Sequence, residues 1–214
     1  MGCAAELAAH RPGLTTPDPC PPGFPITAAS APYDALLSSL VVAFKEQDAL
    51  WLRGSLADRL TRSTSALGDR LAGRVADHEQ VVQQAKVVLV PMPSAPRAVR
   101  ERGLDVTAAL ASSAASRLRS SDRVVRVARL LRQRRRPADQ AGLTAPQRWA
   151  NLHGALVARS TSDWSGWRVV IVDDVVTTGA SLAEANRALT AAGIEVAGAA
   201  VIAATQRRAT ASTG

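Results

Sequence analysis

The segment from Val169 to Ser181, VVIVDDVVTTGAS, constrains the fold of this chain more than any other stretch. Its first four residues are apolar and β-branched, which predicts a buried strand over about residues 168–172. The threonines and the glycine after the two aspartates lead the chain into a helix, which we expect over residues 180–192. A strand, a tight turn and a helix in this order are typical of a parallel α/β sheet.

Similar patterns on both sides of this segment complete the expected fold. Residues 87–90 and 196–203 are short apolar runs and predict two further buried strands. The spacing of strands and helices predicts an α/β fold, with a central, mostly parallel sheet flanked by helices. The remaining expected elements are helices over 33–45, 48–62, 66–84, 104–117 and 145–157, a helix break at 63–65, an edge strand or hairpin arm over 124–131, and a polar loop over 132–145.

Proline usage divides the chain into regions. Residues 1–32 hold seven of the 12 prolines and lack apolar periodicity, so we expect a flexible arm there. The domain should then span residues 33–206, with an N-terminal helical part at 33–85, a core at 86–206, and a short tail at 207–214.

Positive charge is concentrated in one part of the chain. The net charge is +8, and residues 97–148 alone carry 13 arginines against four acidic residues. Such a block predicts an anionic partner, either a phosphorylated small molecule or a nucleic acid. A solvated arginine-rich surface explains the same count equally well.

The cysteines and the N-terminal segment allow predictions about zinc binding and about the cellular location of the protein. Cys3 and Cys20 are the only cysteines, and two cysteines without CxxC spacing do not predict a zinc site or a disulfide framework. The longest uncharged stretch, residues 19–33, holds five prolines and does not suit a membrane helix. With no signal-peptide pattern at the N-terminus, these features favour a cytoplasmic protein.

The aspartates and the loop after them suit a phosphorylated sugar. Ligands of open α/β sheets bind at the carboxyl ends of the strands, where the two aspartates stand ready to accept hydrogen bonds from ribose hydroxyls. The start of the following helix offers unpaired N–H groups to a 5′-phosphate, and glycine lets the backbone come close to it. The residues expected to contact the ribose and its phosphate are Asp173, Asp174, Thr177, Thr178, Gly179, Ala180 and Ser181.

The same motif resembles the binding signature for 5-phosphoribosyl-1-pyrophosphate (PRPP) in type I phosphoribosyltransferases. Three further segments, residues 33–45, 87–103 and 139–156, resemble the ComF family of competence-associated phosphoribosyltransferase-like proteins. The resemblance covers about residues 33–206. Many ComF proteins carry an N-terminal zinc ribbon with four cysteines, which this chain lacks, so no zinc-dependent role is carried over.

The resemblance implies roles for residues outside the motif. The loop from Met92 to Arg97 is expected to bind the pyrophosphate, and residues 132–145 correspond to a flexible catalytic loop. Asp173 and Asp174 would be the catalytic residues, and Mg²⁺ would bind through the substrate, with these aspartates as candidate ligands. The residues expected at the pyrophosphate or in the loop are Arg97, Arg102, Gln140, Arg148 and Asn151.

Three functions remain open at this stage. The first is a phosphoribosyltransferase that transfers the sugar to an unidentified acceptor and releases pyrophosphate. The second is a non-catalytic, PRPP-binding factor in DNA uptake, whose basic block contacts single-stranded DNA. Trp149, directly after Arg148, is the only aromatic residue at that block, whereas single-strand binding normally uses several stacking aromatics. The third is a degenerate fold without a ligand.

Overall fold

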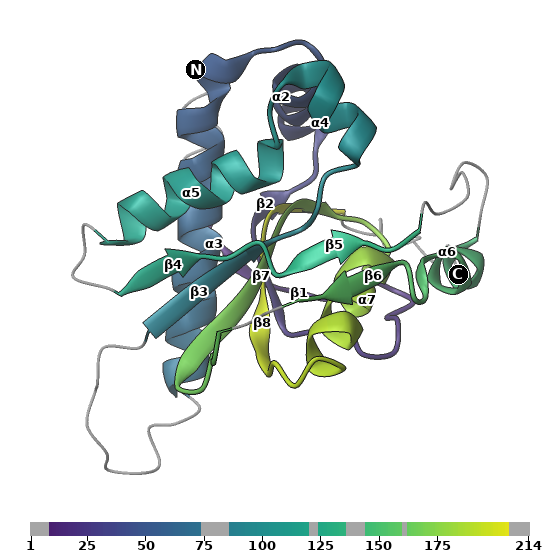
Figure 1. Ribbon diagram of the computed structural model, residues 1–214. Coiled ribbons are helices and arrows are strands. Elements are labelled where there is room, and N and C mark those ends of the chain that lie inside the picture. The colour runs from purple at the N-terminus through teal and green to yellow at the C-terminus, as the bar shows by residue number, and fades with distance from the viewer. Residues whose placement is uncertain (1–8, 74–85, 120–123, 136–143, 160–161, 206–214) are drawn as a thin grey trace, which may run out of the picture.

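The computed structural model describes residues 9–73, 86–119, 124–135, 144–159 and 162–205 (Figure 1). Its centre is a six-stranded sheet in the order β1-β2-β8-β7-β3-β4. All neighbouring strands pair in parallel except β1 and β2, which confirms the expected α/β fold. The six strands are β1 (Gly13–Thr15), β2 (Thr27–Pro32), β3 (Lys86–Pro91), β4 (Val125–Val127), β7 (Trp167–Val176) and β8 (Val196–Ala204).

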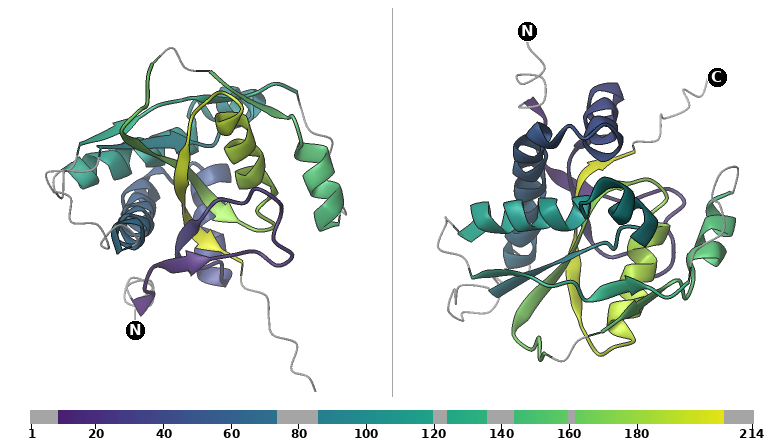
Figure 2. Two further views of the ribbon diagram at one scale, coloured as in Figure 1. Left: turned by 90° about the horizontal axis from the view of Figure 1, so that it is seen from below. Right: turned by 45° about the horizontal axis from the view of Figure 1, so that its top comes forward.

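Helices cover both faces of this sheet (Figure 2). One face carries α2 (Ala35–Glu46), α3 (Arg53–Gly73) and α5 (Val106–Arg119), and a 3-10 turn, η1 (Leu50–Leu52), leads into α3. The other face carries α7 (Ala180–Thr190) together with a separate pair of antiparallel strands, β5 (Leu131–Gln133) and β6 (Leu156–Ala158). Two short helices, α4 (Pro96–Arg102) and α6 (Ala145–Leu152), complete the described elements.

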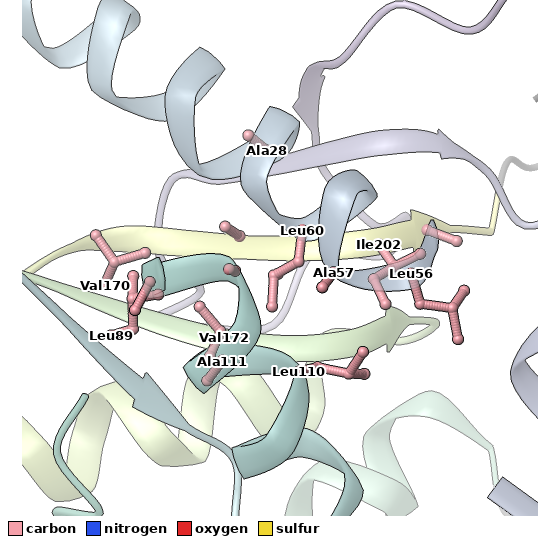
Figure 3. Close-up of a cluster of buried hydrophobic side chains, with 14 of the residues drawn as sticks. Ala28, Leu56, Ala57, Leu60, Leu89, Leu110, Ala111, Val170, Val172 and Ile202 are labelled. Atoms are coloured by element: carbon pink, nitrogen blue, oxygen red, sulfur yellow. The ribbon is translucent and has the colours of Figure 1, made fainter. Parts of the chain in front are cut away.

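The central strand β7 contributes to both cores because successive side chains of a strand point to opposite faces. Val170 and Val172 pack in the cluster that holds Leu56 and Leu60 of α3 (Figure 3). Val169 and Ile171, which alternate with them, pack in the cluster beneath α7. A strand buried on both faces should be continuously apolar, and this is the pattern that identified it in the sequence.

The expectation of a flexible arm through residue 32 is wrong in its described part, because β1 and β2 both lie there and pair with each other. Residues 27–32 form β2, which pairs in parallel with β8. Ala28 is fully buried, and the Ser30 hydroxyl donates a hydrogen bond to the Ile202 carbonyl at 2.8 Å. The strand reads TAASAP and lacks large apolar residues, so it gives little hydrophobic signal. Its small side chains fit where α3 packs closely over the sheet.

The structure also corrects several boundaries. The break expected at residues 63–65 is absent, because α3 continues through it and the hydroxyls of Ser63 and Thr64 donate to the Leu60 carbonyl at 3.1 and 2.7 Å. Strand β7 runs on to Val176 instead of ending at residue 172. Helix α4 is an element that was not expected, and two expected elements are divided or shortened. Residues 124–131 separate into β4 and the start of β5, and α6 ends at Leu152 ahead of β6. Part of the expected polar loop is β5, and residues 136–143 lie outside the described part of the chain.

Gly198 in β8 provides a test of how tightly residues 26–32 are held. A Cβ atom at Gly198 would lie 2.7 Å from the carbonyl oxygen of Ile26 and 3.0 Å from the methyl carbons of Leu67. We expect Gly198→Ala to lower the free energy of unfolding by about 1–3 kcal/mol, as overpacking does. Urea denaturation measures this change.

Gly68 in the middle of α3 provides the matched control. Its Cβ would meet no atom within 4 Å, so Gly68→Ala should raise the stability by up to about 1 kcal/mol. If Gly198→Ala is as stable as the wild type, Ile26 and β2 do not pack against β8 as described.

Candidate functional site

A pocket of about 360 Å³ opens where β3 and β7 end, between the helices of the two faces. It receives side chains from α2, from the loop after β3, from α5, from the β5–β6 pair and from α7. The residues that carry the argument below are Lys45, Glu46, Met92, Ser94, Arg102, Gln133, Leu156, Asp173, Ser181 and Glu184. The pocket therefore lies at the edge of the sheet where the sequence placed the ligand.

The two aspartates lie on β7 just beyond the end of its neighbour β3. The last pair between these strands joins Pro91 and Val172, whereas β7 continues to pair with β8 as far as Val176. The two carboxyl groups interact, and Asp173 Oδ1 accepts the backbone N–H of Asp174 at 2.9 Å. Asp173 lines the pocket, whereas Asp174 is only 6% exposed and forms an ion pair with Lys45 of α2.

The surroundings of Asp173 and Lys45 shift the pKa values of both residues. Burial raises the pKa of Asp173 well above its ordinary value, and the neighbouring charge of Asp174 raises it further. Burial lowers the pKa of Lys45, but the charge of Asp174, its hydrogen bond with the lysine and the charge of Asp173 together leave the lysine pKa above its ordinary value. Lys45 therefore neutralises Asp174. Asp173 remains able to bind a cation or to accept a hydrogen bond from a hydroxyl group.

The loop that should hold the phosphate begins helix α7. Gly179 is its N-cap residue, with a φ of 73° that favours glycine, and Ser181 in the first turn lines the pocket. Thr177 is exposed, Thr178 is half-buried, and Ala180 is buried.

Gly179 does not serve as an opening toward a ligand on its Cβ side. A Cβ atom there would lie 2.7 Å from the ring of Phe24 and 2.8 Å from Pro17, so the chain ahead of β2 packs against this glycine. This corrects the expectation that the absent side chain leaves room for the phosphate. The side chain of Ser181 faces the pocket, as does the start of α7 from which it projects.

The loop after β3 forms the opposite wall. Ser94 donates a hydrogen bond to Asp105 at 2.9 Å, and the same carboxylate oxygen accepts the Ala108 N–H at 3.2 Å in the first turn of α5. Asp105 thus fixes the loop to the helix that follows. Arg102 lines the pocket and is held by Glu46 at 2.8 Å.

Arg97 and Asn151 do not line the pocket, unlike Arg102. Arg97 is exposed and pairs with Glu101 on its own helix at 2.6 Å. The carbonyl of Asn151 accepts a hydrogen bond from Arg135 at 2.6 Å. Gln140 lies outside the described residues, as does the side chain of Arg148.

A buried acid that the sequence analysis missed joins α7 to the β5–β6 pair. Glu184 is 5% exposed, accepts the N–H of Leu156 at 3.0 Å, and pairs with Arg187 at 2.7 Å. It holds the wall formed by Leu156 and Gln133 against the pocket. One signal was present in the sequence, since an acidic residue three positions before an arginine on a helix is a typical ion pair.

The arginines of residues 97–148 do not make a single open basic surface in the part of the segment that is described. Besides those already named, Arg119 donates to the Val125 carbonyl at 2.9 Å. Arg126 lies 4.8 Å from the ring centroid of Trp167. Several charges of the block are therefore used within the fold.

The side chains near the pocket decide how it could hold a metal ion. Within the described residues, no three His, Cys, Asp or Glu side chains gather into a group that could hold a metal ion. Asp173 nevertheless offers a carboxylate at the pocket, and Mg²⁺ is often held by one or two carboxylates together with substrate phosphates. The pocket fits a magnesium ion that enters with a phosphorylated substrate.

Comparison with known families agrees with this geometry. The phosphoribosyl transferase domain matches residues 102–212, which include β7, the loop after it and α7. This match covers more than half of the chain, and the protein belongs to the phosphoribosyl transferase domain family. Comparison with curated proteins finds no match. Among the described residues, no helix has the length and apolar character that a membrane crossing requires.

The raised pKa of Asp173 predicts how stability depends on pH. In the folded protein this carboxyl holds its proton to a higher pH than in the unfolded chain. Its contribution to stability is therefore complete below the ordinary carboxyl pKa and is lost as pH rises through the raised value. We expect the Tm of Asp173→Asn, relative to wild type, to increase between pH 4 and pH 8.

Asp163 gives a control of opposite sign. It is exposed, and hydrogen bonds from Ser165 lower its pKa, so Asp163→Asn should slightly lower the Tm at neutral pH. A Tm difference for Asp173→Asn that does not change with pH would show that the pKa of Asp173 is not raised in the folded protein.

Proposed function

We propose that this protein is a cytoplasmic, PRPP-binding phosphoribosyltransferase of the ComF type. It transfers a phosphoribosyl group to an acceptor that is still unidentified and releases pyrophosphate. The observation that carries this proposal is the pocket itself, which brings together Asp173, Ser181 and Arg102 from three separate elements. Family membership supplies the substrate class, and the pocket supplies groups for each part of that substrate.

The ribose 5-phosphate end of PRPP fits the α7 side of the pocket. The first turn of an α-helix has N–H groups without intrahelical partners, and the helix dipole favours an anion there. Ser181 adds a hydroxyl donor at the pocket, whereas Thr177, Thr178, Gly179 and Ala180 precede it in the chain and do not line the pocket. Asp173 accepts hydrogen bonds from the ribose hydroxyls.

The pyrophosphate end fits the wall opposite. Arg102 presents a planar guanidinium there, which suits paired phosphate oxygens. The loop at Met92–Ala95 lies beside it and is anchored through Ser94. Gln140, Arg148 and Asn151 remain proposals as residues that close or anchor the loop over the substrate.

The reaction exchanges one bond for another at C1 of the ribose. The bond from C1 to the pyrophosphate oxygen breaks, and its electron pair leaves with the pyrophosphate. A nitrogen of the acceptor forms the new bond to C1 and loses its proton. Asp173 orients the ribose and offsets the positive charge that develops on the sugar, while Arg102 stabilises the departing pyrophosphate.

Magnesium bound with PRPP would neutralise phosphate charge, and Asp173 would help to hold it, because the other two carboxylates that line the pocket, Glu46 and Glu184, already pair with arginines. Asp174 is less suited to this role because Lys45 already pairs with it. In this proposal Asp174 acts by positioning α2 against β7.

The alternative of a non-catalytic factor that binds single-stranded DNA receives less support. Several arginines of the basic block are paired with acidic groups or carbonyls of the fold. Trp149 lies on α6 as a single aromatic residue, whereas binding of a single strand normally uses several stacking aromatics. We therefore favour the enzyme.

Replacing Asp173 tests the substrate. We expect Asp173→Asn to weaken binding of PRPP with Mg²⁺ by about 1.5–3 kcal/mol, the range for hydrogen bonds to charged groups. Asp174→Asn should instead lower the free energy of unfolding by about 1–3 kcal/mol, because Lys45 loses its partner. Isothermal titration and urea denaturation measure the two effects. Wild-type affinity in Asp173→Asn would contradict the assignment of the ribose site.

Two arginines of α4 test the pyrophosphate end. Arg102→Gln should reduce affinity for PRPP at least tenfold, because it removes a charged donor, while ribose 5-phosphate binding is retained. Arg97→Gln is the matched control, because its side chain is exposed, pairs with Glu101 and does not line the pocket. Release of pyrophosphate, assayed over a panel of nitrogenous bases, should fall in the first variant and remain in the second. Equal losses in both variants would place the pyrophosphate outside this pocket.

A further inference from the structure

A second pocket, of about 430 Å³, lies on the face of the molecule covered by α2, α3 and α5. It shares no lining residue with the pocket at the end of β7. Leucines from α2, η1 and α3 form its apolar part, and three arginines and one aspartate bring charge to it. The charged residues are Asp58, Arg59 and Arg62 of α3 and Arg117 of α5.

Arg59 is the unusual residue of this pocket. Only 5% of its surface is exposed, and its Nη1 atom is buried without a hydrogen-bond partner among the described residues. Burial lowers the pKa of Arg59, and the neighbouring charge of Arg62 lowers it further. A buried cation without a partner is costly, and such groups normally pair with an opposite charge.

The charge of Asp58 raises the pKa of Arg59 but does not outweigh burial and Arg62, so the guanidinium is compensated only in part. The one carboxylate that lines the pocket, Asp58, accepts a hydrogen bond from Nε of Arg62 at 2.8 Å. The guanidinium of Arg117 donates a hydrogen bond to the Gly54 carbonyl at 3.1 Å. The charges that line the pocket therefore sum to +2, with a buried guanidinium at its wall.

The helix geometry gathers donors on one side. Ser55, Arg59 and Arg62 follow one another at intervals of four and three residues, which places them on the same face of α3. All three line the pocket. Two guanidinium groups and a hydroxyl next to an apolar floor suit a ligand with one anionic end and one apolar end.

We propose that this pocket binds a small organic phosphate. Its phosphate meets Arg59 and Arg62, and its apolar part lies against the leucines. The volume suits a single small ligand. A nucleic acid strand is a poorer fit, because its phosphates need a track of exposed cations, whereas Arg59 is buried within a recess.

Adenosine 5′-monophosphate is a suitable probe, with adenosine, inorganic phosphate and a thymidine 15-mer for comparison. Binding is measured by isothermal titration to the wild type, Arg59→Met, Arg62→Gln and Arg70→Gln. Arg70 is the matched control, because it is an exposed arginine of the same helix that does not line this pocket. Binding that is lost with Arg59 and kept with Arg70 reports this pocket, whatever the first pocket binds.

We expect the nucleotide to bind wild type and Arg70→Gln equally, and about tenfold or more weaker to Arg59→Met and Arg62→Gln. Adenosine should bind weakly to all four proteins. The ligand-free Arg59→Met variant should have a higher Tm than wild type, since methionine removes a buried charge.

Three results would overturn the proposal. The first is unchanged nucleotide affinity in both Arg59→Met and Arg62→Gln. The second is inorganic phosphate binding as tightly as the nucleotide, which would exclude a role for the apolar floor. The third is binding of the 15-mer alone that depends on Arg59, which would identify a nucleic acid site instead. Since Arg62 is exposed, the Arg62→Gln variant keeps the test decisive even if Arg59→Met fails to fold.

Discussion

The ion pair between Lys45 and Asp174 ties the site together. Two adjacent carboxylates on a central strand repel each other, and burial makes both charges costly. A lysine from α2 reaches across to one of them and leaves the other facing the pocket. The N-terminal helices therefore belong to the site as much as the strand that carries the motif, because removing α2 would leave Asp174 buried without its cation.

Sequence reasoning recovered the parts of the fold whose signal is local. Strands β3, β7 and β8 are apolar runs buried on both faces, and α7 follows a turn with a glycine at positive φ. Strand β2 was missed because alanine and serine carry almost no hydrophobic pattern, although contact with β8 buries them fully. The continuity of α3 was missed because its hydroxyl residues bond back to the helix instead of breaking it.

The residues of the site also separate into those that the sequence could predict and those that it could not. Asp173, Ser181 and Arg102 could be proposed from one motif and one resemblance, and all three line the pocket. Lys45 and Gln133 lie far from the motif in sequence, and the spacing of Glu184 to Arg187 predicts an ion pair but no place at the pocket, so only folding brings these residues to it. Arg97 is the opposite case. Its charge suggested that it binds a ligand, but it pairs with Glu101 on the same helix.

The packing of Phe24 and Pro17 against Gly179 has a consequence for the loop that begins α7. A loop held from outside by the chain ahead of β2 is already ordered before any anion arrives. The conformational entropy of that loop is then lost during folding and not at the moment of binding, so that more of the interaction energy remains as affinity. If the loop binds the phosphate as proposed, the proline-rich segment contributes to recognition by preorganisation.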